Sequence, residues 1–200
     1  MILTRQQSHN GEFSESLEVD FCSWLTPGNQ IEIEVGCSKG AFILPASSIR
    51  RKTKFIGIER SGHATVLKRR VQKWNTDNVL VAQMDARDFF RFIVPNNIVN
   101  EIHIYFPTPM ANCGGIPILN LEVIKEMHRS LRFSGCIRLA TDSQKYFKHI
   151  TECFNDLGFW FSKWQPYRGD DGQCIENIGS FWEKRMYLNE RKIYRTLVRK

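Results

Sequence analysis

The chain has 200 residues, of which 42% are hydrophobic and 24% are charged, a balance typical of folded globular proteins rather than disordered chains. Lys and Arg number 28 against 21 Asp and Glu, so the net charge is +7. Such an excess is common in proteins that bind a polyanion such as nucleic acid, and it also occurs in proteins that bind none. The longest apolar runs, such as residues 98–106, are too short to span a bilayer, and the first residues lack the apolar core of a signal peptide. We therefore expect a cytoplasmic protein without a membrane partner.

The elements follow a regular alternation from residue 31 onward. Residues 1–30 have weak periodicity, which indicates an N-terminal extension with one short helix over residues 16–25. Strands are predicted at residues 31–36, 54–59, 79–82, 101–106 and 136–140, and helices at residues 39–49, 61–75, 85–94, 121–131 and 143–157. Two further strands, at residues 159–164 and 192–198, are joined by a predicted loop. The alternation predicts an α/β fold in which a single domain, residues 31–200, has an open, mostly parallel sheet with helices on both faces.

The apolar spacing within two of the helices predicts which side chains face the sheet. We expect one helix to bury Val66, Leu67, Val71 and Trp74, and the next to bury Phe89, Phe92 and Ile93.

The cysteines and histidines give no sign of a metal site. The six cysteines are scattered without Cys-x-x-Cys spacing, and the five histidines show no metal-binding spacing. We expect reduced, mostly buried thiols and no metal.

Three features follow the first three strands, and parallel sheets bind ligands at the carboxyl ends of their strands. Gly36 and Gly40 would let a ligand approach the backbone after the first strand, although their spacing alone is explained better by a tight strand-to-helix turn. Glu59 ends the second strand and can accept both hydroxyls of a ribose, or is a solvated acid. Asp85 follows the third strand and can reach an adenine edge, cap a helix, or do both.

Polar groups also follow the later strands. Thr108 lies in a proline-rich turn, Asp142 follows the fifth strand, and residues 180–183 precede the last strand. Taken singly, each is better explained as a cap or a surface residue than as a site. Clusters of Lys and Arg near aromatic residues suit RNA, although solvated helix faces and core aromatics explain them too.

Taken in order, these features resemble the bacterial-type tRNA (guanine-N7-)-methyltransferases, which use S-adenosylmethionine to methylate the guanine at position 46 of the tRNA variable loop. The matching segments are residues 34–40 (family Glu-Ile-Gly-Phe-Gly-x-Gly), 56–59 (Ile-Gly-Ile-Glu), 85–86 (Asp-Ala), 140–142 (Ala-Thr-Asp, followed by Tyr146) and 180–183 (Thr-Lys-Phe-Glu). The resemblance extends over residues 31–199.

The resemblance implies a Rossmann-like, seven-stranded class I S-adenosylmethionine-dependent methyltransferase fold and a site at the carboxyl edge of the sheet. Its implied cofactor residues are Glu34, Gly36, Gly40, Glu59 and Asp85. It implies Asp142 and Thr108 as catalytic residues. It implies Asn112, Asp142, Ser180 and Glu183 as contacts to the guanine or the tRNA.

The chain departs from the family in its most diagnostic run, Phe-Pro-Asp-Pro-Trp-Pro-Lys followed by basic residues. In this run, Thr108 replaces the Asp, Met110 replaces the Trp and Asn112 replaces the Lys, and residues 113–117 contain no basic residue. In the first motif, Ser38 replaces the middle glycine. Three hypotheses therefore stand: a tRNA (guanine-N7-)-methyltransferase with a variant loop, a degenerate member that binds RNA or a partner, and a methyltransferase for another acceptor.

Guanine N7 has an exposed lone pair and no proton to lose, so methyl transfer to it needs no general base. The enzyme must place N7 in line with the sulfonium methyl group. Carboxylates such as Asp142 and Glu183 can accept hydrogen bonds from the guanine edge and offset the positive charge that develops on the base, whereas Thr108 brings no charge.

Overall fold

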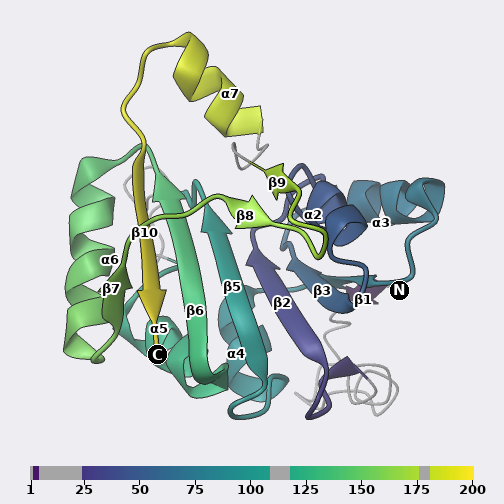
Figure 1. Cartoon of the computed structure of the whole chain (residues 1–200), viewed down its shortest axis with the longest axis horizontal. Coiled ribbons are helices and arrows are strands. Elements are labelled where there is room, and N and C mark those ends of the chain that lie inside the picture. The colour runs from purple at the N-terminus through teal and green to yellow at the C-terminus, as the bar shows by residue number, and fades with distance from the viewer. Residues whose placement is uncertain (1, 5–23, 109–117, 176–180) are drawn as a thin grey trace, which may run out of the picture.

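The computed structural model describes residues 2–4, 24–108, 118–175 and 181–200 (Figure 1). The strands are β1 (Ile2–Thr4), β2 (Gln30–Val35), β3 (Thr53–Ile58), β4 (Val79–Gln83), β5 (Val99–Tyr105), β6 (Leu131–Thr141), β7 (Trp160–Ser162), β8 (Tyr167–Arg168), β9 (Cys174–Ile175) and β10 (Tyr194–Arg199). The helices are α2 (Ile43–Ile49), α3 (His63–Trp74), α4 (Ala86–Phe92), α5 (Leu121–Ser130), α6 (Gln144–Asp156) and α7 (Phe181–Leu188).

The main sheet has the strand order β1-β4-β3-β2-β5-β6-β10-β7. Strands β1 to β6 run parallel, whereas β10 runs antiparallel to both β6 and β7. The order reverses at β2, which pairs with β3 on one side and β5 on the other, and open α/β sheets bind ligands beside such a reversal. The predicted α/β fold is confirmed. The predicted extension adds a strand, because β1 pairs with β4 at the sheet edge.

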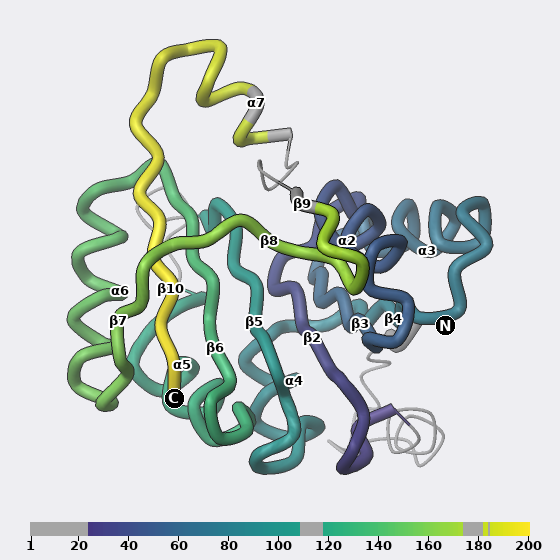
Figure 2. Tube along the Cα trace, in the orientation of Figure 1, coloured from purple at the N-terminus to yellow at the C-terminus, as the bar shows by residue number. Residues whose placement is uncertain are grey.

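Side chains alternate between two cores because successive strand residues point to opposite faces. In β4, Val79 and Val81 pack with α2 and α3, whereas Leu80 and Ala82 pack with α4, α5 and α6. Helices therefore cover both faces of the sheet, and Figure 2 shows α2 and α3 grouped beside β3 and β4.

Two predicted helix faces are wrong in part. Helix α3 buries Ala64, Leu67 and Val71, but Trp74 is 47% exposed, because the helix ends there at a left-handed Asn75. Helix α4 buries Phe89 and Phe90 while Phe92 is 56% exposed, because the stripe that faces the sheet runs through Ala86, Phe89 and Phe90.

The predicted loop between the last two strands is also wrong. It contains the hairpin of β8 and β9 and the helix α7. In addition, β6 begins at Leu131, five residues before the predicted start, and passes through an irregular stretch in which Ser134 has a φ of 65°. The predicted helix over residues 16–25 falls almost wholly outside the described residues.

The thiols of Cys37, Cys136 and Cys153 are buried and free, as expected. Within the described ranges, no helix is long and apolar enough to cross a membrane.

Candidate active site at the carboxyl edge of the sheet

Strand pairing brings the ends of β2, β3 and β4 to one edge of the sheet. The N–H of Gly36, just after β2, donates to the carbonyl of Ile58 at 2.8 Å. The N–H of Glu59, just after β3, donates to the carbonyl of Ala82 in β4 at 3.0 Å. The predicted cofactor residues that follow these strands are therefore neighbours.

Glu59 binds the turn after β2 directly. One carboxylate oxygen accepts the N–H of Ser38 at 3.0 Å, and the other accepts the N–H of Ser61 at 2.8 Å. An ionised carboxylate has about four acceptor positions, so Glu59 keeps acceptor capacity for a ligand's hydroxyl groups. This half-buried side chain has the location that the ribose prediction requires.

The turn after β2 has glycine-like geometry along its length. Gly36 and Gly40 have φ values of 73° and 80°, and a Cβ at Gly40 would lie 2.3 Å from Leu67 Cδ1. Ser38, at the position where the family has glycine, also takes a left-handed conformation, with a φ of 48°. Its hydroxyl lies 3.3 Å from Nδ1 of His63 at the start of α3. The turn keeps the backbone shape of a glycine motif despite the serine.

Glu34 lies beneath this turn rather than on its rim. It is 6% exposed, and its carboxylate accepts the N–H of Ile43 at 3.1 Å, at the start of α2. Burial, with the nearby charge of Glu59, raises the pKa of Glu34 well above its ordinary value. A buried acid with a raised pKa beside a strand end is a recurrent feature of functional sites.

Asp85 caps α4, as one of its two predicted roles requires. Its Oδ1 accepts from the backbone N–H and from Nε of Arg87, both at 2.9 Å, and its Oδ2 accepts from Nη2 at 2.7 Å. Hydrogen bonding to Arg87 lowers the pKa of Asp85. The carboxylate is thus held ionised at the end of β4.

The acceptor side of the site lies at the ends of β5 and β6. Phe106 has a φ of 51°, rare for an aromatic residue, and its N–H donates to the carbonyl of Ala140 at 2.7 Å. Two residues later, Thr108 is exposed. Asp142 follows β6 and lies 3.6 Å from the guanidinium of Arg191. The structure thus brings Thr108 and Asp142 to neighbouring strand ends.

Glu183 differs from its expected setting at a strand end or loop. It lies in α7, is 1% exposed and forms an ion pair with Arg195 of β10. The hydroxyl of Tyr187 also accepts from this guanidinium at 3.1 Å. These contacts fix α7 to β10, which pairs with β6. The predicted residues Asn112 and Ser180 lie outside the described residues.

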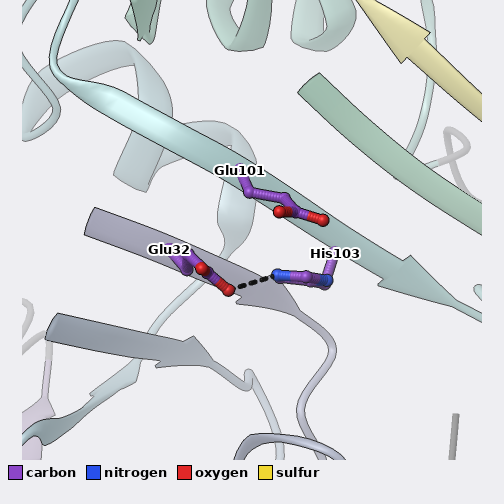
Figure 3. Close-up of side chains that lie close together, drawn as sticks. All are labelled: Glu32, Glu101 and His103. Carbon is purple, nitrogen blue, oxygen red and sulfur yellow. Dashed lines mark hydrogen bonds and ion pairs between the residues drawn. The ribbon is translucent and has the colours of Figure 1, made fainter. Parts of the chain in front are cut away.

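Sequence reasoning missed a buried polar cluster below the site. Glu32, Glu101 and His103 offer ligand atoms within 4.8 Å of one another, which is metal-like spacing (Figure 3). However, Glu32 pairs with Arg50 and Glu101 pairs with Arg138, so the two acids are already balanced by guanidinium groups and a cation is not needed. The signal was present in the alternation of residues 31–34, which places Glu32 on a central strand.

The cluster also holds Glu32 ionised. Nε2 of His103 lies 2.9 Å from the Glu32 carboxylate, and the hydroxyl of Tyr105 lies 2.8 Å from Nδ1. Burial acts to raise the pKa of Glu32, but the hydrogen bond and charge of His103, with the charge of Arg50, hold the pKa below its ordinary value.

Comparison with known families identifies a match over most of the chain. A family described as "Putative methyltransferase" matches residues 28–196. A protein of Rubrobacter xylanophilus named tRNA (guanine-N(7)-)-methyltransferase is 27% identical over 172 residues, covering 82% of this chain and 74% of that protein. A protein of Chlorobium phaeobacteroides with the same name is 27% identical over 138 residues, covering 68% of each chain.

Solved structures share the fold. The precorrin-6y C5,15-methyltransferase of Geobacter metallireducens has a TM-score of 0.59 at 12% identity, covering 96% of this chain and 92% of that chain. A SAM-dependent methyltransferase of Aquifex aeolicus has a TM-score of 0.56 at 14% identity, covering 86% of this chain and 82% of that chain. At these identities the likeness concerns the arrangement of the sheet and helices.

Proposed function

Because the chain belongs to this methyltransferase family, we propose that it transfers the methyl group of S-adenosylmethionine to N7 of a guanine in tRNA. The family match and the relatives named tRNA (guanine-N(7)-)-methyltransferase support the activity and the substrate class. We further propose, from the sequence resemblance, that the guanine is at position 46 of the variable loop. A cytoplasmic location stays a prediction.

The observation that supports the cofactor site most is the binding of the β2 turn by Glu59. A backbone with left-handed residues lets a ligand approach closely, and Glu59 stands where ribose hydroxyls can reach it. We propose that Asp85, at the next strand end, accepts from the adenine edge and that Glu34 offsets the positive charge of the cofactor. The position of Asp85 at the start of α4 and the bond from Ile43 to Glu34 support these roles.

Methyl transfer at this edge is a one-step displacement. The N7 lone pair forms a bond to the methyl carbon while the bond between that carbon and sulfur breaks. The electron pair of the broken bond stays on sulfur, which gives neutral S-adenosylhomocysteine. The positive charge passes to the methylated base, and no proton is moved. The chain's contribution is therefore placement of N7 in line with the sulfonium group.

Residues that follow β5 and β6 would hold the acceptor base. The Asp142 carboxylate can accept from the guanine N1–H and N2–H groups and offset the charge that develops on the base. The Arg191 guanidinium, 3.6 Å from Asp142, is placed to move onto a phosphate when the guanine takes the carboxylate. Thr108 can add one uncharged hydrogen bond. We propose Asn112 and Ser180 as further contacts on the resemblance. We propose Glu183, which is buried and paired with Arg195, as a residue that holds α7 in position rather than as a direct contact.

A labelled-methyl assay tests the proposal. The protein is incubated with S-adenosylmethionine labelled in its methyl group and an unmodified tRNA transcript, and the label is mapped by digestion. Label at N7 of the variable-loop guanine supports the function, and a transcript with adenine at that position serves as the matched control. Cofactor binding without label in any tRNA would instead favour a degenerate, RNA-binding member.

A further inference from the structure

The segment between β7 and α7 crosses the sheet and is fastened to the buried cluster. We call residues 164–175 the strap; β8 and β9 are its two short strands, and Figure 1 shows β8 passing over the face of β5 and β6 toward α2. Tyr167 is its anchor, because it is 4% exposed and its hydroxyl donates to Oε2 of Glu32 at 2.6 Å.

Arg50 fastens the strap a second time. Its guanidinium carbon lies 4.1 Å from the centre of the Tyr167 ring, and its Nε donates to the carbonyl of Arg168 at 2.6 Å. The same guanidinium pairs with Glu32. Beyond β8, the N–H of Asp170 donates to the carbonyl of Ile49 at 2.8 Å. The strap is thus bonded to the end of α2 as well as to β2.

Arg138 fastens the other end of the strap. Its Nη1 donates to the carbonyl of Gln165 at 2.5 Å, and its guanidinium carbon lies 5.5 Å from the ring centre of Trp164. Glu101 holds this guanidinium from β5. Glu32 therefore orients Arg50, and Glu101 orients Arg138 and also lies 3.7 Å from the Arg50 guanidinium. Each arginine binds one end of the strap, which gives the cluster a use besides charge balance.

The fastened strap supports the acceptor side of the site. Trp164, Phe106 and Ile193 pack against the same core on the α2 face of the sheet. Phe106 has the left-handed backbone that turns the chain toward Thr108, and such a conformation persists only where its surroundings fix it. The strap is part of those surroundings, because Phe106 packs against the core that contains Tyr167 of the strap, whereas the cofactor turn after β2 is held by Glu59 and by backbone bonds to Ile58.

We propose that Tyr167 is a positioning residue for the acceptor: its bond to Glu32 latches the strap, and the latched strap holds the Phe106–Thr108 turn in place for the substrate. The proposal rests on the proposed function for the identity of the substrate, tRNA. It assigns Tyr167 no contact with either substrate. The latch acts on acceptor binding and leaves the cofactor half of the site unchanged.

Tyr167→Phe tests the latch, because it removes one hydroxyl and keeps the ring against Arg50. We expect KM for the tRNA transcript to rise by about three- to tenfold, the effect of one lost internal hydrogen bond, while Kd for S-adenosylmethionine changes less than about twofold. The control is Ser130→Ala, which removes a buried hydroxyl that donates to Met127 at the opposite end of the sheet. It should leave both constants unchanged.

Amide hydrogen exchange gives the readout that a general loss of stability would not reproduce. In Tyr167→Phe, we expect faster exchange at Asp170 and Phe106, with Gly36 unchanged. An unchanged tRNA KM, a parallel rise in the cofactor Kd, or equal acceleration at all three amides would overturn the proposal. If the unsubstituted protein binds cofactor and methylates no tRNA, the proposed function fails. In that case the pattern of amide exchange alone tests the latch.

Discussion

A carboxylate oxygen of Glu59 accepts the backbone N–H of Ser38 at 3.0 Å, and this contact joins the ends of two neighbouring parallel strands. Ser38 stands where related proteins have glycine, and it takes a left-handed conformation that costs an L-residue about 1–2 kcal/mol. The bond from Glu59 offsets part of that cost. The same side chain therefore shapes the cofactor turn and remains available to a ligand.

Replacing Glu34 with Gln should stabilise the protein at alkaline pH. The pKa of Glu34 is raised, so its contribution to stability is fully present below the ordinary carboxyl pKa and is lost as pH rises through the folded value. Gln keeps an acceptor for the Ile43 N–H and carries no charge. We expect a gain on the order of 1 kcal/mol in unfolding free energy at pH 8, absent at pH 4, measured by urea denaturation.

The same Glu34→Gln variant should bind S-adenosylmethionine more weakly, because the sulfonium charge favours ionisation of Glu34 when the cofactor binds and Gln cannot ionise. Glu122→Gln, on the exposed first turn of α5, is the control and should change neither property. The account of Glu34 is wrong if the gain in unfolding free energy of Glu34→Gln over the unsubstituted protein is no larger at pH 8 than at pH 4.

Asp85 should show the opposite pH dependence. Its pKa is lowered by Arg87, so its stabilisation is present above the ordinary Asp value and disappears as pH falls through the folded one. Asp85→Asn keeps a helix cap but loses the partly exposed ion pair, so we expect a cost of about 0.5–1 kcal/mol at pH 7 that shrinks as pH falls below the ordinary Asp pKa. Asp85→Ala also loses the cap, about 1 kcal/mol more, at every pH. Thermal unfolding across pH should therefore give two parallel profiles separated by the cost of the cap. Coincident profiles, or a cost of Asp85→Asn that does not change with pH, would contradict this assignment.

Restoring the family's residues in the acceptor turn should speed methyl transfer. In the double variant Thr108→Asp, Asn112→Lys, a carboxylate returns beside the base, and single preorganised groups are worth about 2–4 kcal/mol in the transition state. We expect kcat to rise at least tenfold in the labelled-methyl assay. The matched control carries Thr108→Asn in place of Asp. Equal rates for the two double variants would show that charge at this position is not what limits the reaction.

Local patterning was enough to predict the sheet and to place the candidate cofactor residues at one edge of it. The predicted strand at residues 31–36 corresponds to β2 at Gln30–Val35, because alternation of apolar and acidic residues depends only on neighbours in sequence. Glu59 and Asp85 could be placed at one edge because parallel strands end together.

The strap and α7 could not be predicted, because their contacts are distant in sequence. Tyr167 binds Glu32, 135 residues earlier, and nothing near residue 167 signals a buried partner. Helix α7 has no clear apolar stripe, and the burial of Glu183 depends on Arg195 across the chain reversal into β10. Likewise, the depth of Glu34 follows from the position of Ile43, which the helix prediction beginning at residue 39 did not define.

The cofactor site is the central claim, and calorimetric titration with S-adenosylmethionine tests it most directly. We predict a saturable heat of binding with one site per chain. In Glu59→Ala, which removes both bonds to the turn and the ribose acceptor, affinity should fall at least tenfold, since hydrogen bonds to a charged group contribute about 1.5–3 kcal/mol. The absence of binding heat in the unsubstituted protein, or equal affinity in the two proteins, would contradict the account.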